Sequence, residues 1–310
     1  MKTFRRLWLL LPLLMAGCTK QDATPCPPKT NTTIYFNLID VAERDVFSAL
    51  VDQVDLFVYD ANGRQVSRTA VPKGELSQFA GKRLKLNPGQ YTVVAWANAA
   101  SPLTHYVTAE NSSYLDNAQN YLQTAATRAD VAENGDPLYY APKGKGAHLT
   151  VTVPETGQAQ ATAEMRPAHV KLEVTVTGYD PKAHGQSNLL TMEVTDLTSR
   201  YGFGMNAYGE KVSYVQQVSN AQSVEKAFVA MFNIPVFDRN TGTEIRITEG
   251  SGKMILPAIS LKEILGDKIN LETLWHLPIK VAFTEENGLL SVSVKVDLPE
   301  WGEGDVRPNI

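Results

Sequence analysis

Apolar and polar residues alternate one by one along several segments of this 310-residue chain. A period of two turns one row of side chains toward a core and the other toward water, as in an antiparallel β-strand. The longest runs are Val170–Thr177 and Leu290–Leu298, and shorter runs occur at Ile34–Leu38, Leu149–Val153 and Leu277–Val281. Many short strands with one buried face predict an all-β protein built from antiparallel sandwiches.

Turn motifs between the alternating runs support this fold class. Asn62-Gly63 and Asn287-Gly288 each separate two such runs, and Asn-Gly in that position is a strong hairpin signal. Two segments depart from the alternation and are expected to be short helical insertions. Ser113–Val131 has helical spacing of its apolar residues, and Ile259–Leu265 is expected to form a helix that ends at Gly266.

The first 17 residues are expected to be a lipoprotein signal peptide. Three basic residues among the first six precede the apolar run Leu7–Leu14, which is as long as a signal-peptide core and too short to span a bilayer. The run leads into Ala16-Gly17-Cys18, which resembles the bacterial lipobox, with Met15 where leucine is usual. We therefore expect cleavage between Gly17 and Cys18, and covalent attachment of diacylglycerol and an N-acyl chain to Cys18.

Residues 18–31 would then form a lipidated, proline-rich tether. Several acyl chains hold a protein stably on a membrane, because each buried methylene contributes roughly 0.8 kcal/mol. Cys26 is the only other cysteine, so no disulfide framework is expected and the fold must rest on its apolar core. Two alternatives remain open, namely an ordinary signal peptide followed by a chance cysteine and an intermolecular disulfide through Cys26.

Length and strand order predict two domains. The mature chain of about 290 residues exceeds one typical domain and is long enough for two separate cores. A boundary is expected at Arg166-Pro167, after the hairpin-like pair His148–Val153 and Gln158–Met165 and before a new long strand. The expected domains are residues 32–166 and 167–310.

The residue patterns give no support to catalysis, metal binding or nucleic-acid binding. Nucleophile-elbow, phosphate-loop and dinucleotide motifs are missing from the sequence, and its five histidines lack the spacing of a zinc site. Asp52, Asp55 and Asp60 do not follow the pattern of a calcium loop, and Asp60 is expected to start a turn. The net charge of −4 includes no basic stripe for a phosphate backbone. We expect a protein that is not an enzyme and carries no cofactor besides its covalent lipid.

Several segments resemble the fimbrillin-A associated anchor proteins, which are minor lipoprotein subunits of Bacteroidetes type V fimbriae. Val54–Gly63 and Leu84–Asn98 carry the resemblance, Arg166–Gly178 resembles the start of the family's second domain, and Leu290–Trp301 resembles its closing strand. The resemblance implies two transthyretin-like β-sandwich domains in tandem, attachment to the outer membrane, and fimbrial subunits as partners. It also implies a role in anchoring, starting or limiting a fimbrial polymer.

The same resemblance draws attention to the first strand and to an arginine that follows it. Major fimbrillins are cut after an arginine, which removes their first strand and opens a groove that a neighbour's strand fills. An anchor must keep its lipidated N-terminus. Ile34–Ile39 is the candidate first strand, and Arg44 is either a processing site or an ordinary loop residue.

A strand near the C-terminus is the candidate donor to another subunit. Its apolar row consists of Leu290, Val292, Val294, Val296 and Leu298. The alternative is that this strand closes the second sandwich.

Two rival functions stay open. The chain could be a protease-processed stalk or tip subunit, or a surface adhesin that binds a glycan or a host protein. Trp96, Trp275 and Trp301 are candidates for stacking on sugars, although Trp96 lies in a strand expected to be in the core.

Overall fold

The computed structural model describes residues 29–40, 42–99, 104–107, 121–124, 126–128, 131–132, 134–141, 148–180, 188–203, 207–219, 227–237, 242–266, 276–286 and 289–296. Within them the chain forms strands β1 to β20 and three short helices, which confirms the all-β fold class. In these ranges no helix is long and apolar enough to cross a membrane.

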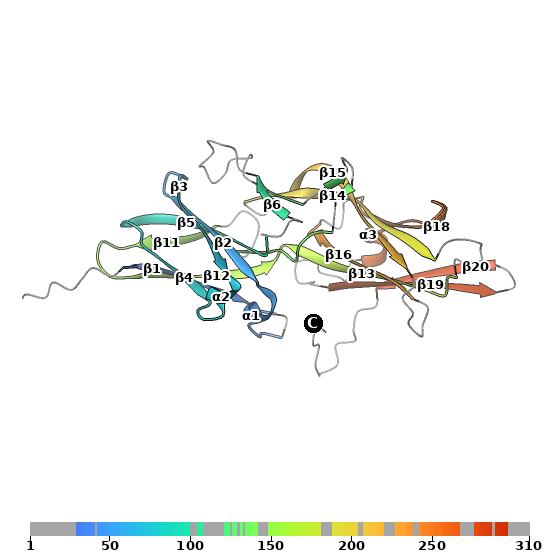
Figure 1. Ribbon diagram of the computed structural model, residues 1–310, viewed down its shortest axis with the longest axis horizontal. Helices are drawn as coiled ribbons and strands as arrows, with labels where there is room; N and C mark the ends of the chain where they lie inside the picture. Colours follow the sequence, from blue (N-terminus) through green and yellow to red (C-terminus); the bar gives the residue numbers. More distant parts are fainter. Residues whose placement is uncertain are drawn as a thin grey trace, which may run out of the picture.

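One sheet takes its strands from the first half of the chain, on the left of Figure 1. They are β1 (Thr32–Leu38), β2 (Gln53–Asp60), β3 (Gln65–Pro72), β4 (Gly81–Leu84), β5 (Gly89–Ala97), β10 (Tyr139–Ala141), β11 (Leu149–Val153) and β12 (Ala159–Pro167). Their order is β3-β2-β5-β10-β12-β1-β4, and β11 pairs with β5. Helices α1 (Phe47–Leu50) and α2 (Lys73–Leu76) connect strands of this sheet. Alternate residues of β1, β2, β5 and β12 form the first core.

The hairpin expected before the domain boundary is wrong in its pairing. Both strands are present, but β11 pairs with Gly89–Val93 of β5, while β12 runs parallel to β1 and antiparallel to β10. Alternation along a strand predicts which side chains are buried. It does not predict which distant strand becomes the neighbour.

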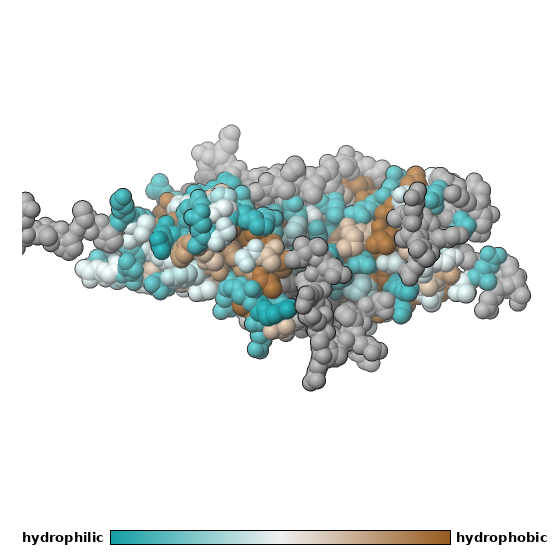
Figure 2. Space-filling view, turned by 60° about the horizontal axis from the view of Figure 1, so that its bottom comes forward, coloured by the Kyte–Doolittle hydropathy of each residue, from teal (hydrophilic) through white to brown (hydrophobic). Residues whose placement is uncertain are grey.

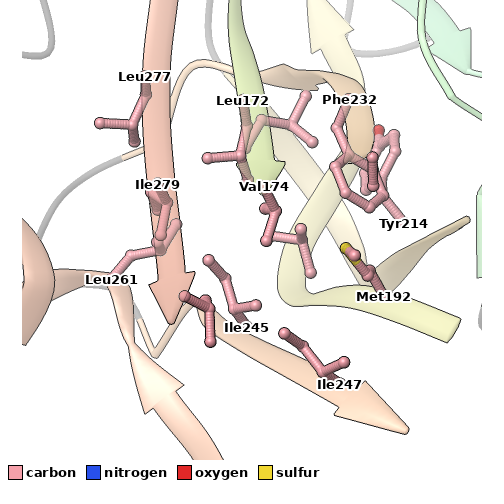
Figure 3. Close-up of a cluster of buried hydrophobic side chains, with 14 of the residues drawn as sticks. Leu172, Val174, Met192, Tyr214, Phe232, Ile245, Ile247, Leu261, Leu277 and Ile279 are labelled. Carbon is pink, nitrogen blue, oxygen red and sulfur yellow. The ribbon is translucent and has the colours of Figure 1, made fainter. Parts of the chain in front are cut away.

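Two sheets come mainly from the second half and enclose the second core. The four-stranded sheet, in the order β16-β13-β19-β20, contains β13 (His169–Thr177), β16 (Phe228–Pro235), β19 (His276–Glu286) and β20 (Leu289–Val296). The other sheet has the order β18-β17-β14-β15-β9-β8, with β7 paired to β14 and β6 to β7. Its strands are β6 (Thr104–Val107), β7 (Tyr121–Thr124), β8 (Ala126–Arg128), β9 (Val131–Ala132), β14 (Leu189–Gly202), β15 (Ala207–Ser219), β17 (Glu244–Glu249) and β18 (Met254–Ser260). Figure 3 shows Val174 and Ile279 of the four-stranded sheet near Ile245 of the other sheet.

The helix expected at Ser113–Val131 is wrong for the part that the structure describes. From Tyr121 onward this segment forms β7, β8 and β9. Strand β7 pairs with the end of β14, and β9 pairs in parallel with β15. The long strands β14 and β15 offer edges for pairing, and this tertiary contact overrides the helical spacing of the apolar residues.

The second expected helix is confirmed as α3 (Leu261–Leu265). The hydroxyl of Ser260 accepts the N–H of Lys262 at 3.2 Å, which caps the first turn. Gly266 ends the helix with a φ of 57°, a left-handed conformation that glycine adopts without strain. Leu261 and Leu265 are buried in the second core.

Strands β2, β5 and the short β10 are buried on both faces. One face packs in the first core, while Phe57 of β2 and Trp96 of β5 lie on the opposite face. The ring of Phe57 lies 4.8 Å from that of Phe203, and the ring of Trp96 lies 5.7 Å from that of Tyr201. We name this group the junction cluster, and its members are Phe57, Tyr59, Val94, Trp96, Ala99, Leu138, Tyr140, Ala168, Tyr201 and Phe203.

Hydrogen bonds fix two tyrosines of the junction cluster, Tyr140 from the first half of the chain and Tyr201 from the second half. The Tyr140 hydroxyl donates to the carbonyl oxygen of Phe203 at 2.8 Å. The Tyr201 hydroxyl donates to the carbonyl oxygen of Ala168 and accepts the N–H of Val236 at 2.8 Å. Because these groups are buried, each bond also prevents the cost of an unsatisfied polar atom.

The junction also contains a neutral histidine. Burial lowers the pKa of His169 to about 4, although its hydrogen bond to Leu138 acts in the opposite direction. Its Nδ1 lies 2.8 Å from the carbonyl oxygen of Leu138. Since a carbonyl only accepts, Nδ1 carries the proton and His169 is uncharged at pH 7.

Replacement of Trp96 tests how much the junction cluster contributes to stability. We expect Trp96→Ala to lower the free energy of unfolding by about 3–5 kcal/mol, because it leaves a cavity between the two halves. Val66→Ala, at a β3 side chain that is 47 % exposed, should cost less than about 0.5 kcal/mol. Urea denaturation of the mature chain measures both, and equal costs would contradict this role of the cluster.

Candidate functional site

The predicted lipid site lies outside the described residues, which begin at residue 29. Other predictions that lie outside the described residues concern Gly17, Cys18, Cys26, Trp275, Leu298, Trp301, the Asn287-Gly288 turn and residues 113–120 of the expected helix. Trp96 is described and buried in the junction cluster, so its ring has no face available to a sugar. Within the described ranges, no group of three His, Cys, Asp or Glu side chains could hold a metal ion.

Strand β1 contains most of the candidate first strand and is held on both sides. It runs parallel to β12 along its whole length and antiparallel to β4 over Thr32–Tyr35. Ile34, Phe36 and Leu38 are buried in the first core. Loss of β1 would therefore open an apolar groove between β12 and β4.

Asn31 fixes the chain just before β1. Its side-chain amide donates to the carbonyl oxygen of Leu86 at 2.8 Å and accepts the N–H of Leu86 at 2.9 Å. The amide thus pairs with a peptide group as a neighbouring strand would. Sequence reasoning placed Asn31 at the end of the tether and gave no sign of this contact.

Arg44 lies in a tight turn that follows β1. The N–H of Asp40 donates to the carbonyl oxygen of Arg44 at 2.9 Å, and Oδ1 of Asp40 accepts the N–H groups of Ala42 and Arg44 at 2.9 Å each. Ile39 and Asp45 form a β-bridge across the turn. The backbone around Arg44 is therefore folded back on itself.

The turn that was predicted at Asp60 is confirmed and shows the same hydrogen bonds. Its N–H donates to the carbonyl oxygen of Arg64, and its Oδ1 accepts the N–H groups of Asn62 and Arg64, all at 2.9 Å. Gly63, with a φ of 75°, occupies the position that Glu43 holds with a φ of 60°. Glycine is common at such positions, but the turn at Arg44 has Glu43 there instead. The signal that the sequence did contain was an aspartate followed four residues later by an arginine, which both turns share.

The Arg44 side chain is bound to the residue that starts the turn. Its Nε and Nη2 lie 2.9 and 2.8 Å from Oδ2 of Asp40. Burial acts to raise the pKa of Asp40, but hydrogen bonds from Arg44 and Ala42 outweigh it and lower the pKa below its ordinary value. The Arg44 side chain is still 52 % exposed. A protease can reach it, but cleavage requires the backbone to leave the turn.

Strand β20 contains most of the candidate donor strand and forms one edge of its sheet. It pairs antiparallel with β19 over its full length, from Val296 opposite Ile279 to Leu289 opposite Glu286. Val294 and Val296 pack against the second core, whereas Val292 is 42 % exposed. Release of β20 from β19 would uncover the two packed valines.

Apolar side chains also reach the surface elsewhere in the second half. Figure 2 shows hydrophobic residues on this part of the molecule. Among the described residues of this half, the exposed large apolar side chains are Leu189, Val229, Met254 and Val292. They are scattered over four strands, and only Val292 belongs to a candidate functional residue set.

A family model covers nearly the whole chain. The model described as fimbrillin-A associated anchor proteins Mfa1 and Mfa2 matches residues 22–306. No curated protein matches the chain in sequence.

Solved structures share the fold at low sequence identity. A candidate adhesin from Bacteroides ovatus is 13 % identical with a TM-score of 0.68, covering 88 % of this chain and 96 % of that chain. A candidate polysaccharide-binding protein from Bacteroides thetaiotaomicron is 17 % identical with a TM-score of 0.64, covering 87 % and 96 %. The fimbrial anchor protein Mfa2 from Porphyromonas gingivalis is 17 % identical with a TM-score of 0.62, covering 86 % and 97 %.

Limited proteolysis tests whether Asp40 restrains Arg44. We expect Asp40→Ala to accelerate trypsin cleavage after Arg44 by about tenfold or more, because hydrogen bonds to a charged group contribute roughly 1.5–3 kcal/mol to closing the turn. Asp60→Ala is the matched control, since it should accelerate cleavage after Arg64 and leave Arg44 unaffected. Mass spectrometry of the fragments locates the cuts, and an unchanged rate at Arg44 in Asp40→Ala would show that the turn gives no protection.

Proposed function

This chain belongs to the family of fimbrillin-A associated anchor proteins, and from that membership we propose that it is the lipid-anchored minor subunit of a fimbria. In this role it holds or starts the polymer at the outer membrane and is exposed on the cell surface. Its partners are other fimbrial subunits, and it performs no catalysis. The match of the family model over residues 22–306 is the observation that carries the proposal.

Membrane attachment rests on Cys18. The proposal assigns residues 1–17 to the signal peptide and residues 18–31 to a tether whose cysteine carries the diacylglycerol and the N-acyl chain. The lipobox-like Ala16-Gly17-Cys18 supports this assignment. Several acyl chains suffice for stable attachment.

The proposed body consists of two transthyretin-like sandwich domains, residues 32–166 and 167–310. Two separate apolar cores support this division. Strands β6 to β9 are an exception to this division. They come from the first residue range but belong to the sheet of β14 and β15. The junction cluster would then hold the domains against each other.

Retention of β1 distinguishes an anchor from a processed stalk or tip subunit. Cleavage after Arg44 would remove β1 together with the lipidated tether. The Asp40 turn, which occupies both the backbone and the side chain of Arg44, favours retention. Pairing with neighbouring subunits is proposed to involve β20, the strand that carries most of the Leu290–Leu298 row.

A second candidate function is adhesion to a glycan or a host protein. Its support is the fold shared with a candidate adhesin and a candidate polysaccharide-binding protein. Trp275 and Trp301 remain its proposed sugar-stacking residues, because Trp96 is buried. Saturable binding of one glycan class by the mature chain, lost on substitution of either tryptophan, would favour this candidate.

Substitution of the lipidated cysteine tests the anchor proposal. We expect Cys18→Ala to remove the protein from the membrane fraction and to release fimbriae from the cells, because a chain without acyl groups has no stable hold on the bilayer. Cys26→Ala is the matched control and should leave both unchanged. Cell fractionation and immunoblotting measure the outcome, and a Cys18→Ala protein that stays on the membrane with its fimbriae would contradict the proposal.

A further inference from the structure

Strands β1 and β12 run in the same direction, so the start of β1 and the end of β12 lie at opposite ends of the pair. Seven consecutive residue pairs join them, from Thr32 opposite Ala159 to Leu38 opposite Met165. The residues proposed as the tether precede β1, and β12 leads after one residue into β13. A pull on the tether against the second half therefore acts on the two strands in opposite directions, along their length.

The direction of such a pull decides how firmly β1 is held. The hydrogen bonds of a parallel pair are evenly spaced along both strands. A pull along the strands loads these bonds together, in shear. A pull on two strand ends that lie side by side opens the bonds one at a time, as in a zipper. Shear gives the higher barrier to forced opening, because several bonds must break in one event.

Asn31 secures the end of β1 at which this load enters. Its N–H donates to the carbonyl oxygen of Leu84 at 2.9 Å, and its carbonyl oxygen accepts the N–H of Ala159 at 2.9 Å. Its side-chain amide binds both backbone groups of Leu86, at 2.8 and 2.9 Å. These four hydrogen bonds reach the neighbours of β1 on both sides. They oppose fraying of β1 from its loaded end.

The buried side chains of β1 oppose sliding. Ile34, Phe36 and Leu38 point into the first core and are at most 3 % exposed. A shift of β1 by one residue along β12 would turn this whole row away from the core. Partial sliding therefore offers no stable intermediate, and the pair is expected to give way as a unit.

The connection from β12 to β13 is fixed as well. Ala168, the single residue between them, is 0 % exposed. Its N–H donates to the carbonyl oxygen of Leu138 at 2.8 Å, and its carbonyl oxygen accepts the Tyr201 hydroxyl and the N–H of Val236, the latter at 3.4 Å. Figure 1 shows β12 and β13 following one another along the longest axis of the molecule. Because Ala168 is held on both sides, this connection does not act as a hinge.

We propose that Asn31, β1 and β12 form a mechanical clamp, which resists a pull on the tether in shear and passes the load through Ala168 to β13. Strand β13 can take up this load, since it lies between β16 and β19 in its sheet. The inference rests on the proposed anchor function, in which the lipid holds the tether at the membrane and the polymer holds the second half. The clamp would keep β1 in place under that tension.

Force-clamp spectroscopy of the full mature chain tests the direction of the load, with Cys18→Ala and Cys26→Ala removing the native thiols. One attachment pair is Lys29→Cys and Lys171→Cys, which pulls the start of β1 away from β13. The matched pair is Ala42→Cys and Lys171→Cys, which pulls from the turn after β1, at the end of the pair that leads into β13. At the same force, the first pair should survive about tenfold longer or more, because its bonds must break together.

A substitution at the loaded end tests the role of Asn31. Asn31→Ala should accelerate rupture of the 29–171 pair by about fivefold or more, because it removes the two side-chain bonds to Leu86. Its effect on the 42–171 pair should be smaller. Asp60→Ala is the matched control, since it also removes two side-chain bonds to backbone groups but lies away from β1. It should leave both lifetimes unchanged.

Equal lifetimes in the two pulling directions would overturn the clamp, as would an Asn31→Ala chain that ruptures no faster than the Asp60→Ala chain. Either result would leave the anchor function standing, because release of fimbriae by Cys18→Ala does not depend on how β1 is loaded. Conversely, fimbriae that stay on cells with Cys18→Ala would contradict the anchor function while the direction dependence of rupture remained measurable.

Discussion

Burial of β2 and β5 on both faces joins the two halves of this chain. One face completes the first core, and the other receives Tyr201 and Phe203 from the end of β14. Because close-packed aromatic rings lose their contacts if either side moves, the halves are fixed to each other through Trp96 and its neighbours. This rigid connection would suit the proposed anchor role, in which one half is held at the membrane and the other contacts the polymer.

Hydrogen bonds at strand edges and turns determine which strands can leave their sheet and which edges can pair with another chain. Asn31 and the Asp40 turn secure β1 at its two ends, and Gln216 and Asn134 close the outer edge of β16. All of these contacts use side chains to satisfy backbone groups.

Sequence alone was enough for the fold class and for individual strands, because a period of two is visible wherever a strand has one wet face. The run at Val170–Thr177 is an example. The sequence was less informative where pairing with distant strands determines the secondary structure. An example is the segment from Tyr121 onward, which pairs with β14 and β15. The family resemblance came from local strand and turn motifs such as Val54–Gly63, and the family model confirms it.

The candidate site was predicted in part. Alternation identified Leu290–Leu298, and the position of Arg44 after the first strand drew attention to it. The restraint on Arg44 went unnoticed because Glu43 stands where a glycine would have signalled the turn. The amide caps of β16 could not be foreseen, since Asn134 and Asn233 are nearly a hundred residues apart in the sequence.

A chain that acts as the proposed anchor must keep its first strand and its lipid after assembly. Intact-mass and N-terminal analysis of the protein extracted from assembled fimbriae tests this most directly. An N-terminus at an acylated Cys18, with β1 still present, is the predicted result. A protein that begins at Asp45 would contradict it and would identify a processed stalk or tip subunit.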